Sequence, residues 1–321
     1  MQREGSPWQG LGTVLLKELA DHFDSVRMFL LALLMVLASV VPFYNGEEQL
    51  RGTVDPFPLL KLFNPGGHTL SVVTILSFLI PVMAIGLGFD SVNGEHNRRT
   101  LSRILAQPIY RDALLAGKFL AALIALSVSL VCLWLLVVGF GVLVLGVPPS
   151  GDEFARSLAF LLIAISYAGV WLGVAMLLSV LFRSPASAAL LALGVWLFMT
   201  LLWPQIAPEI AGKIAPPHLR TINGLTVLDA EAMKDWFMAL SRISPVFLFV
   251  EATQSILTPT TPSYGPLLDQ LQQLQGTVVG ATLPLRETLL MAWPQIVALV
   301  SGVIALFVAT YVSFQRQEVR A

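Results

Sequence analysis

The chain has 321 residues, of which 56% are hydrophobic and 12% are charged, whereas soluble domains usually carry about 25% charged residues. Its net charge of −1 at pH 7 excludes the basic excess that binding to nucleic acid requires, and too few polar residues are present to coat a soluble globule of this size. Composition therefore predicts an all-α polytopic membrane protein, because lipid offers backbone N–H and C=O groups no partners outside a helix.

The first predicted element is an amphipathic interfacial helix over residues 11–27. Apolar residues recur there at near-helical spacing, at Leu11, Val14, Leu15, Leu19 and Phe23. A helix with one apolar face lies along a membrane surface before the chain enters the lipid. The residues expected at the inner membrane interface are Lys17, Glu18, Arg27 and, further along the chain, Lys118.

Six segments are long and apolar enough to span a hydrocarbon core about 30 Å thick as transmembrane helices. In chain order they cover residues 28–44, 70–89, 114–147, 158–181, 186–206 and 289–314. The third is too long for one straight crossing, so it either tilts and projects into water or bends near Gly139 and Gly141. Small residues inside the spans, among them Gly169 and Gly173, favour close helix packing.

The longest stretch outside the spans covers residues 207–288, and we expect a helical extracytoplasmic cap there, before the last span. Asp229 is the predicted N-cap of a helix with an apolar stripe over residues 229–244. Two further helical pieces are expected over 244–257 and 264–275, separated by prolines. A cap of this size is too small to be an independent enzyme domain.

Arginine and lysine placement predicts the orientation, since these residues gather in cytoplasmic loops. The loop between the second and third spans, residues 92–112, is the densest in positive charge. The opposite short loops carry more acids than bases. The sequence therefore predicts a multi-pass protein of the plasma (bacterial inner) membrane with both termini in the cytoplasm, and an even number of spans agrees with termini on the same side.

Within the 92–112 loop the pattern predicts a short cytosolic helix. Glu95 stands at its N-terminal end, where the helix dipole favours an acid, and Pro108 ends it. Leu101 and Leu105 fall on one side and the arginines on others. Composition alone leaves two interpretations open: a basic loop that fixes topology, or a docking element for a cytosolic subunit.

The pattern of this loop resembles a known family. Gly94-Glu95 is followed by Thr100-Leu101, then by Leu105-Ala106-Gln107-Pro108, Arg111 and Gly117-Lys118. This series is similar to the signature loop of type-2 ATP-binding-cassette (ABC) permeases, in the branch of the nitrous-oxide-maturation permeases. The family usually has glycine before the threonine, where this chain has Arg99. The leader, the segment 244–257 and the basic tail after Phe314 also resemble that family.

The resemblance implies that residues 1–321 form a single permease domain whose coupling helix docks on a separate ABC ATPase subunit. The implied ATPase-coupling residues are Glu95, Arg98, Arg99, Thr100, Leu101, Arg103, Leu105, Pro108 and Arg111. The implied partners are two copies of that ATPase and a second permease, either an identical copy or a close paralogue. ATP and Mg would be bound by the ATPase, and the complex would be an exporter. An alternative is a membrane anchor that transmits force or a signal to an extracytoplasmic protein at the 207–288 cap.

The sequence lacks the catalytic and metal-binding motifs that would indicate an enzyme. Neither Gly117-Lys118 nor Gly212-Lys213 stands in a phosphate-binding loop of the required spacing. The Gly86–Asp90 stretch distantly resembles an intramembrane aspartyl protease motif, but no span holds the second aspartate that such chemistry needs. The spans contain almost no ionisable residues, which argues against an ion-coupled carrier and favours a machine driven from outside the bilayer.

Overall fold

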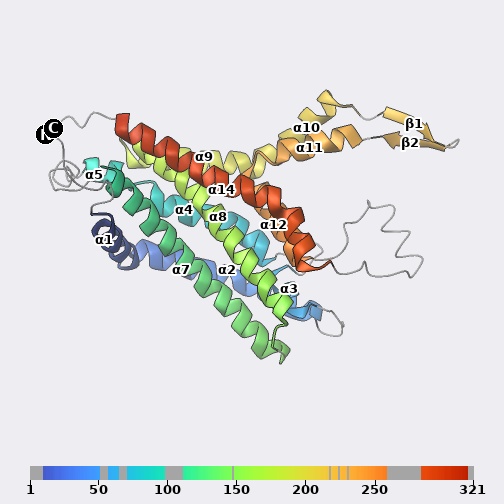
Figure 1. Cartoon of the computed structure of the whole chain (residues 1–321), viewed down its shortest axis with the longest axis horizontal. Helices are drawn as coiled ribbons and strands as arrows, with labels where there is room; N and C mark the ends of the chain where they lie inside the picture. Colours follow the sequence, from blue (N-terminus) through green and yellow to red (C-terminus); the bar gives the residue numbers. More distant parts are fainter. Residues whose placement is uncertain are drawn as a thin grey trace.

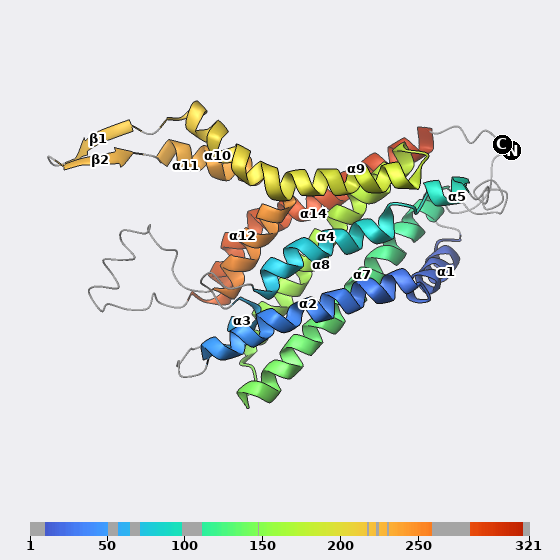
Figure 2. The ribbon, with the colours of Figure 1, turned by 180° about the vertical axis from the view of Figure 1, so that it is seen from behind.

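The computed structural model describes residues 10–50, 57–64, 71–97, 111–146, 148–216, 218–222, 225–229, 231–258 and 283–316. Within these residues the regular structure is helical, apart from one two-stranded hairpin. Figures 1 and 2 show a bundle of long helices from which one helical pair and the hairpin extend sideways. The predicted helical membrane protein is therefore confirmed in outline.

The long helices of the described chain form the bundle. They are α2 (Val26–Leu50), α4 (Val72–Gly88), α7 (Arg111–Leu145), α8 (Gly151–Leu181), α9 (Pro185–Leu197) and α14 (Leu285–Arg316). A five-residue π-helical segment, η1 (Phe198–Leu202), continues α9 into α10 (Trp203–Ile214). The capping residues of α4 and α9 are Ser71 and Ser184, whose hydroxyls accept N–H groups from the first turns.

Five helical stretches have the length and apolar composition to cross a membrane, and they coincide with five of the six predicted spans. They are Val72–Glu95, Arg111–Leu143, Gly151–Leu181, Pro185–Ile214 and Leu285–Arg316. The predicted first span lies on α2, of which Val26–Leu37 is the apolar part. A crossing by α2 stays a prediction.

Helix α8 is the centre of the bundle and packs against α4, α7, α12 and α14. The Tyr167 ring on α8 stacks on Phe249 with centroids 4.6 Å apart, and its hydroxyl donates to Ser77 O at 2.8 Å. A Cβ atom added at Gly173 would lie 2.9 Å from Leu306 Cβ on α14. The predicted use of small residues for close packing is thus confirmed at Gly173.

The long third apolar run forms one continuous helix, α7, without a break near Gly139 and Gly141. Gly141 faces the short helix α3 (Pro58–Phe63), where an added Cβ would lie 2.7 Å from Leu62 Cδ1. The glycine therefore lets α3 pack closely against α7.

The region predicted as a cap contains two of the predicted helices and a hairpin that was not predicted. After α10 come β1 (His218–Ile222) and β2 (Leu225–Asp229), antiparallel with His218 opposite Asp229. Asp229 therefore ends a strand and is not the cap of the next helix, α11 (Glu231–Ser241). The chain then bends by 111° into α12 (Pro245–Leu257). Helices α10 and α11 lie side by side and extend from the bundle, whereas α12 packs back against α8 and α14. The predicted helix over 264–275 lies outside the described residues.

The two ends of the bundle are named here by their short helices. The α1 end comprises α1 (Leu11–Phe23), α5 (Asn93–Asn97), the start of α7 and the end of α14. The α3 end comprises α3, the starts of α8 and α14, and the end of α12. The described chain begins and ends at the α1 end.

Candidate functional site

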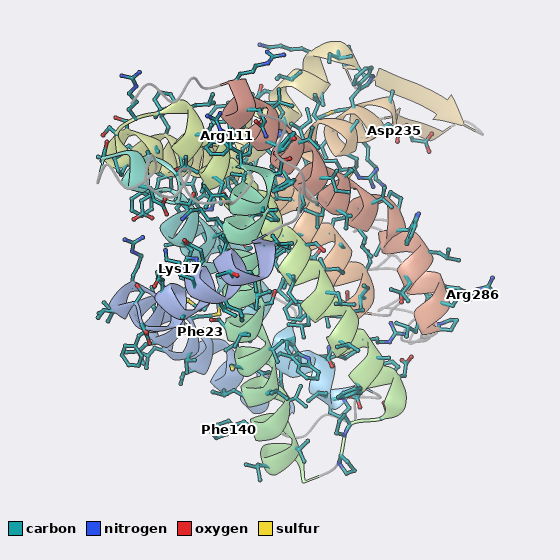
Figure 3. The ribbon with its side chains drawn as sticks, turned by 60° about the vertical axis from the view of Figure 1, so that its left-hand side comes forward. Lys17, Phe23, Arg111, Phe140, Asp235 and Arg286 are labelled. Carbon is teal, nitrogen blue, oxygen red and sulfur yellow. The ribbon has the colours of Figure 1, made fainter. Side chains whose placement is uncertain are left out.

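At the α1 end, α1 crosses the start of α7 at close range, as Figure 3 shows. Gly117 lies at the crossing, because an added Cβ would lie 2.7 Å from Val14 Cγ1, well inside the contact distance of two carbon atoms. Val14, from the predicted apolar stripe, is buried, whereas Phe23 at the end of the stripe is about half exposed. The absence of a side chain at Gly117 brings α1 close enough for the next residue of α7 to bind it.

That next residue, Lys118, joins three elements through one ammonium group. Its Nζ lies 2.9 Å from Glu18 Oε1 on α1 and 2.5 Å from Glu95 Oε1 on α5. The Lys118 side chain is 6% exposed, and the two carboxylates are 13% and 14% exposed. A charge this well buried is tolerated only when it is paired. Lys118 therefore holds α1 and the entrance of the 92–112 loop against α7.

A second ion pair joins the start of α2 to the end of α4. Arg27 donates to both carboxylate oxygens of Asp90 at 3.1 Å and to Gly86 O at 2.9 Å. Its guanidinium also lies over the Phe89 ring, 5.0 Å from the centroid. The pair is more exposed than that of Lys118, so its two parallel hydrogen bonds fix geometry more than they stabilise the fold.

The start of α5 is fastened to the end of α8. The Ser179 hydroxyl accepts the N–H groups of Val92 and Asn93 at 3.1 and 3.3 Å. The Asn93 side-chain amide in turn donates to Phe182 O at 3.2 Å. Asn93 is buried, so these bonds satisfy backbone groups that water does not reach. The entrance of the 92–112 loop is therefore bound to α8 as well as to α7.

The exit of the same loop is bound to the last helix. Gln315 on α14 donates its side-chain amide to the Asp112 carboxylate at the start of α7. Arg111 is the first residue of α7 and lies at this end of the bundle in Figure 3. The remaining predicted coupling residues lie outside the described residues: Arg98, Arg99, Thr100, Leu101, Arg103, Leu105 and Pro108.

The side chains of the α1 end surround a polar cavity of about 230 Å³. Its acids are Glu18, Asp21, Asp90 and Glu95. Its bases are Lys17, Arg27 and Lys118, with His22 beside them. The four acids and three permanent bases nearly cancel, so the cavity does not concentrate one sign of charge as an anion-binding site would. Its charges instead pair across helix boundaries, which suits a mechanical junction.

Burial and ion pairing shift the pKa values on α1. Burial of Glu18 opposes its ionisation, but Lys118 and Lys17 outweigh burial and hold the pKa of Glu18 below its usual 4.5. Burial lowers the pKa of His22 below its usual 6.5. Partial burial of Lys17 is outweighed by its hydrogen bonds to Asp21 and Glu18, which raise the pKa of Lys17. At neutral pH the junction therefore holds charged Glu18 and Lys17 beside a neutral histidine.

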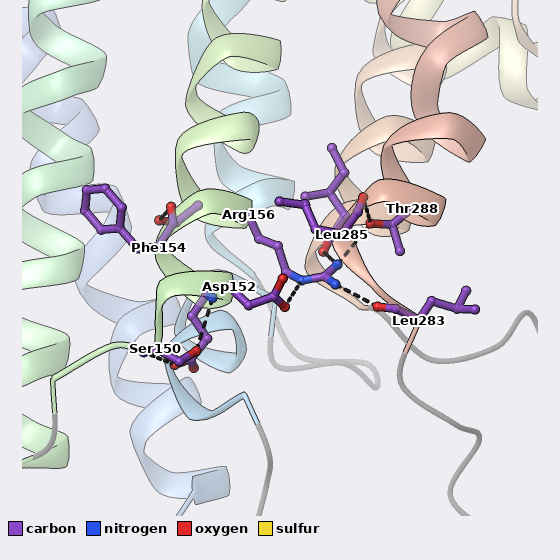
Figure 4. Close-up of polar contacts among 10 residues, drawn as sticks. Ser150, Asp152, Phe154, Arg156, Leu283, Leu285 and Thr288 are labelled. Carbon is purple, nitrogen blue, oxygen red and sulfur yellow. Dashed lines mark hydrogen bonds and ion pairs between the residues drawn. The ribbon is translucent and has the colours of Figure 1, made fainter.

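A second polar cluster lies at the α3 end and begins with a capping box, shown in Figure 4. The Ser150 hydroxyl accepts the Glu153 N–H at 3.2 Å, and Glu153 Oε2 accepts the Ser150 N–H at 2.9 Å. Glu153 Oε1 accepts the N–H of Leu59 on α3 at 2.9 Å. One glutamate thus starts α8 and holds α3 beside it.

Arg156, one turn further along α8, is fully buried and binds two other segments (Figure 4). Its guanidinium donates to Ile256 O at 3.1 Å and to Leu283 O at 2.7 Å, and Asp152 balances its charge at 2.6 Å. It also donates to Thr288 Oγ1 at 3.0 Å. The end of α12 and the start of α14 are therefore held together by one side chain of α8.

The structure brings together five of the residues predicted from sequence and adds several that were missed. Lys17, Glu18, Arg27, Glu95 and Lys118 line one cavity. Sequence reasoning did not find the buried Arg156, nor the roles of Asp90 and His22. The Ser-x-x-Glu spacing of Ser150 and Glu153, a known helix-start signal, was the one sign of the α3-end cluster.

Comparison with known proteins identifies the family. Residues 13–319 match the family described as ABC-2 family transporter protein. A relative from Stutzerimonas stutzeri, named "Probable ABC transporter permease protein NosY", is 33% identical over 223 residues, which cover 64% of this chain and 75% of the relative. A protein of the same name from Pseudomonas aeruginosa is 28% identical over 200 residues, covering 60% of this chain and 67% of the relative. The chain is a multi-pass membrane protein that belongs to the ABC-2 family of transporter proteins.

Proposed function

We propose that this chain is the membrane-spanning permease subunit of an ATP-driven ABC exporter, powered by two copies of a separate ATPase subunit. The observation that carries the proposal is the pair of ion pairs made by Lys118, which fastens Glu18 of α1 and Glu95 of α5 to the same span. Membership of the ABC-2 family and the permease names of two relatives support it. ATP and Mg would be held by the ATPase.

In this proposal the loop between α5 and α7 docks on the ATPase, and its two ends distribute the force. Motion at the entrance passes through Glu95 to Lys118 on α7 and through Asn93 to α8. Motion at the exit passes through Asp112 to Gln315 on α14. The close crossing at Gly117 makes α1 follow α7. Because each contact ends on a different helix, one push on the loop would move most of the bundle.

The same proposal assigns the α1 end to the cytoplasmic face of the plasma (bacterial inner) membrane. Both described chain ends lie at this end together with α5, and the loop that follows α5 is the most basic part of the sequence. A second permease copy, identical or paralogous, would complete the transporter. The lipid-exposed side chains of α2, α9 and α14 leave apolar faces for lipid and for that copy.

The experiment is purification of the permease from its native membrane in mild detergent, followed by ATPase measurement on the complex. An ABC ATPase should copurify, and Glu95→Ala should lower the ability of substrate or lipid to stimulate ATP hydrolysis while leaving basal hydrolysis measurable. Glu251→Ala is the matched control, because Glu251 lies on α12, outside the α1 end, and pairs with Arg242, the residue after α11. Absence of any cassette ATPase, or full stimulation with Glu95→Ala, would refute the proposal.

A second candidate function is an anchor that transmits force to an extracytoplasmic protein. The extension formed by α10, α11 and the β1–β2 hairpin favours it, because this part reaches well beyond the bundle (Figure 1). Replacing residues 218–229 with a short Gly-Ser linker should then abolish capture of the partner while ATP hydrolysis continues. Loss of small-molecule export in that variant, with no partner found, would favour the exporter.

A further inference from the structure

The rod formed by α9, η1 and α10 changes its hydrogen-bond register at η1. The Trp203 N–H donates to Phe198 O, five residues back, whereas an α-helix would direct it to Met199 O, four residues back. Single π-helical turns inside α-helices are rare and frequently mark functional positions. Leu197, Phe198 and Leu201 are exposed, so packing within this chain does little to enforce the π register.

Pro204 decides which carbonyl of the rod loses its main-chain partner. In the π register Met199 O faces residue 204 as its donor, and in the α register Thr200 O does. Proline has no N–H, so Met199 O has no main-chain donor in the π register, and Thr200 O has none in the α register. Each register at η1 therefore leaves one carbonyl without a main-chain donor, and the two registers differ in which carbonyl it is.

Ser244 supplies a hydrogen-bond donor to Met199 O, the carbonyl that lacks a main-chain donor in the π register, and not to Thr200 O. Its hydroxyl donates to Met199 O at 3.0 Å. Ser244 stands at the N-cap of α12, with Pro245 as the first helical residue, yet its hydroxyl makes no cap hydrogen bond to α12, although serine usually does so at this position. The side chain is buried at the corner between α11 and α12 and is directed to the fifth predicted span.

A second bond fastens the same corner. The Trp203 indole Nε1 donates to Leu240 O, near the end of α11, at 2.9 Å. Since Trp203 follows η1 directly, a change of register would rotate its indole about the helix axis and remove it from Leu240 O. The two bonds together tie the register of the rod to the position of the α11–α12 corner.

We propose that η1 is a two-register switch, and that Ser244 selects the π register by binding Met199 O. When the α11–α12 corner moves away, Met199 O takes the Trp203 N–H, the segment becomes α-helical, and α10 turns relative to α9. When the corner returns, the π register forms again. The position of the α11–α12 corner and the register of the rod then change together. This inference goes beyond the proposed function and does not depend on the ATPase.

Three substitutions test the switch from independent directions. Ser244→Ala removes the donor to Met199 O, and Pro204→Ala supplies the N–H that the α register lacks at Thr200 O; both should favour the α register. Ser244→Thr keeps a hydroxyl at the same position and should retain the π register. Pro204→Ala adds a helix-forming residue, so it tests the inference without weakening the fold if Ser244→Ala proves unstable.

The measurement is pulsed electron–electron double resonance on the full chain in lipid nanodiscs, in a Cys132→Ser background because Cys132 is exposed. One pair of spin labels spans η1, at the exposed positions Ala186 and Glu209. The control pair, at Leu162 on α8 and Leu190 on α9, does not span it. Ser244→Ala and Pro204→Ala should each raise, at least threefold, the population of molecules that show a second Ala186–Glu209 distance. The distance distribution of the control pair should stay unchanged.

The proposal fails if the Ala186–Glu209 distribution in both variants superimposes on that of the unmodified chain. It also fails if Ser244→Thr changes the distribution as much as Ser244→Ala does, because the hydroxyl would then be irrelevant. A change at both label pairs in both variants overturns it too, since Ser244 and Pro204 would then hold the bundle itself and not the register of one rod.

Discussion

Lys118 Nζ contacts Glu18 Oε1 at 2.9 Å and Glu95 Oε1 at 2.5 Å, so residues separated by about a hundred positions in the chain are held by one ammonium group. The finding makes α1 and the entrance of the basic loop parts of one unit. Glu18 reaches Lys118 because Gly117 lets α1 approach α7 closely.

Removal of the Lys118 charge should therefore destabilise the α1 end more than any exposed charge would. We expect Lys118→Met to remove the cation that two largely buried carboxylates share, at a cost of about 3 kcal/mol or more, and to lower the Tm of the protein in nanodiscs. Lys118→Arg, which keeps the charge, is the matched control. Equal Tm values for Lys118→Met and the unmodified protein would show that the buried pairs contribute nothing.

A side chain at position 117 should push α1 away from α7. Gly117→Leu places carbon atoms where Val14 now lies, and we expect α1 amides to exchange hydrogen at least tenfold faster while those of α8 keep their protection. Combination with Val14→Gly should restore part of the protection by making room on the other helix. If Gly117→Leu leaves exchange in α1 unchanged, the close crossing is not what holds it.

Loss of Arg156 should loosen the α3 end. Arg156→Met leaves Ile256 O and Leu283 O without their donor and Asp152 without its cation; each unsatisfied buried group costs about 1–3 kcal/mol, so Tm should fall by several degrees. Arg183→Met, at an exposed position, should change the stability by about 0.5 kcal/mol or less. Similar Tm values for the two variants would contradict the assigned role of Arg156.

Acidification should release α1. The pKa of Glu18 is lowered in the fold, so its contribution is fully present above its usual 4.5 and is lost as pH falls through the lowered value. The pKa of His22 is also lowered, so the neutral form favoured by burial is lost as pH falls below 6.5. Lys17, Lys118, Asp21 and Asp90 also face this cavity, and Lys17 stays protonated throughout because its pKa is raised.

A spin label on exposed Leu16 should therefore gain mobility as pH falls from 7 to 4, beginning with the protonation of His22. Glu18→Gln should already raise the mobility at pH 7 and remove the later part of the acid response. Mobility that rises with pH between 7 and 9 instead would reverse the assigned sign and refute the assignment to these two groups.

Sequence patterns located the long helices because their length and apolarity reflect the thickness of the lipid core. They also located α1, which ends at Phe23 and not at residue 27 and whose stripe residue Val14 is buried, and the start of α12 at Ser244-Pro245; an interfacial position for α1 stays a prediction. They missed the β1–β2 hairpin, which has short strands in a segment where the helical pattern was expected to begin at Asp229. A short strand has few residues in which to display its two-residue period.

The sequence by itself determined the family, the helical membrane-protein class and five of the residues that line the α1-end cavity. Those conclusions depend on local composition and spacing, which a chain carries before it folds. The tertiary structure alone decided that Lys118 pairs with both Glu18 and Glu95, that Arg156 is buried at the meeting of three segments, and that the Ser244 hydroxyl binds Met199 O and not its own helix. Each is a contact between distant parts of the chain, so its partners are set by how helices cross and not by any pattern along one of them.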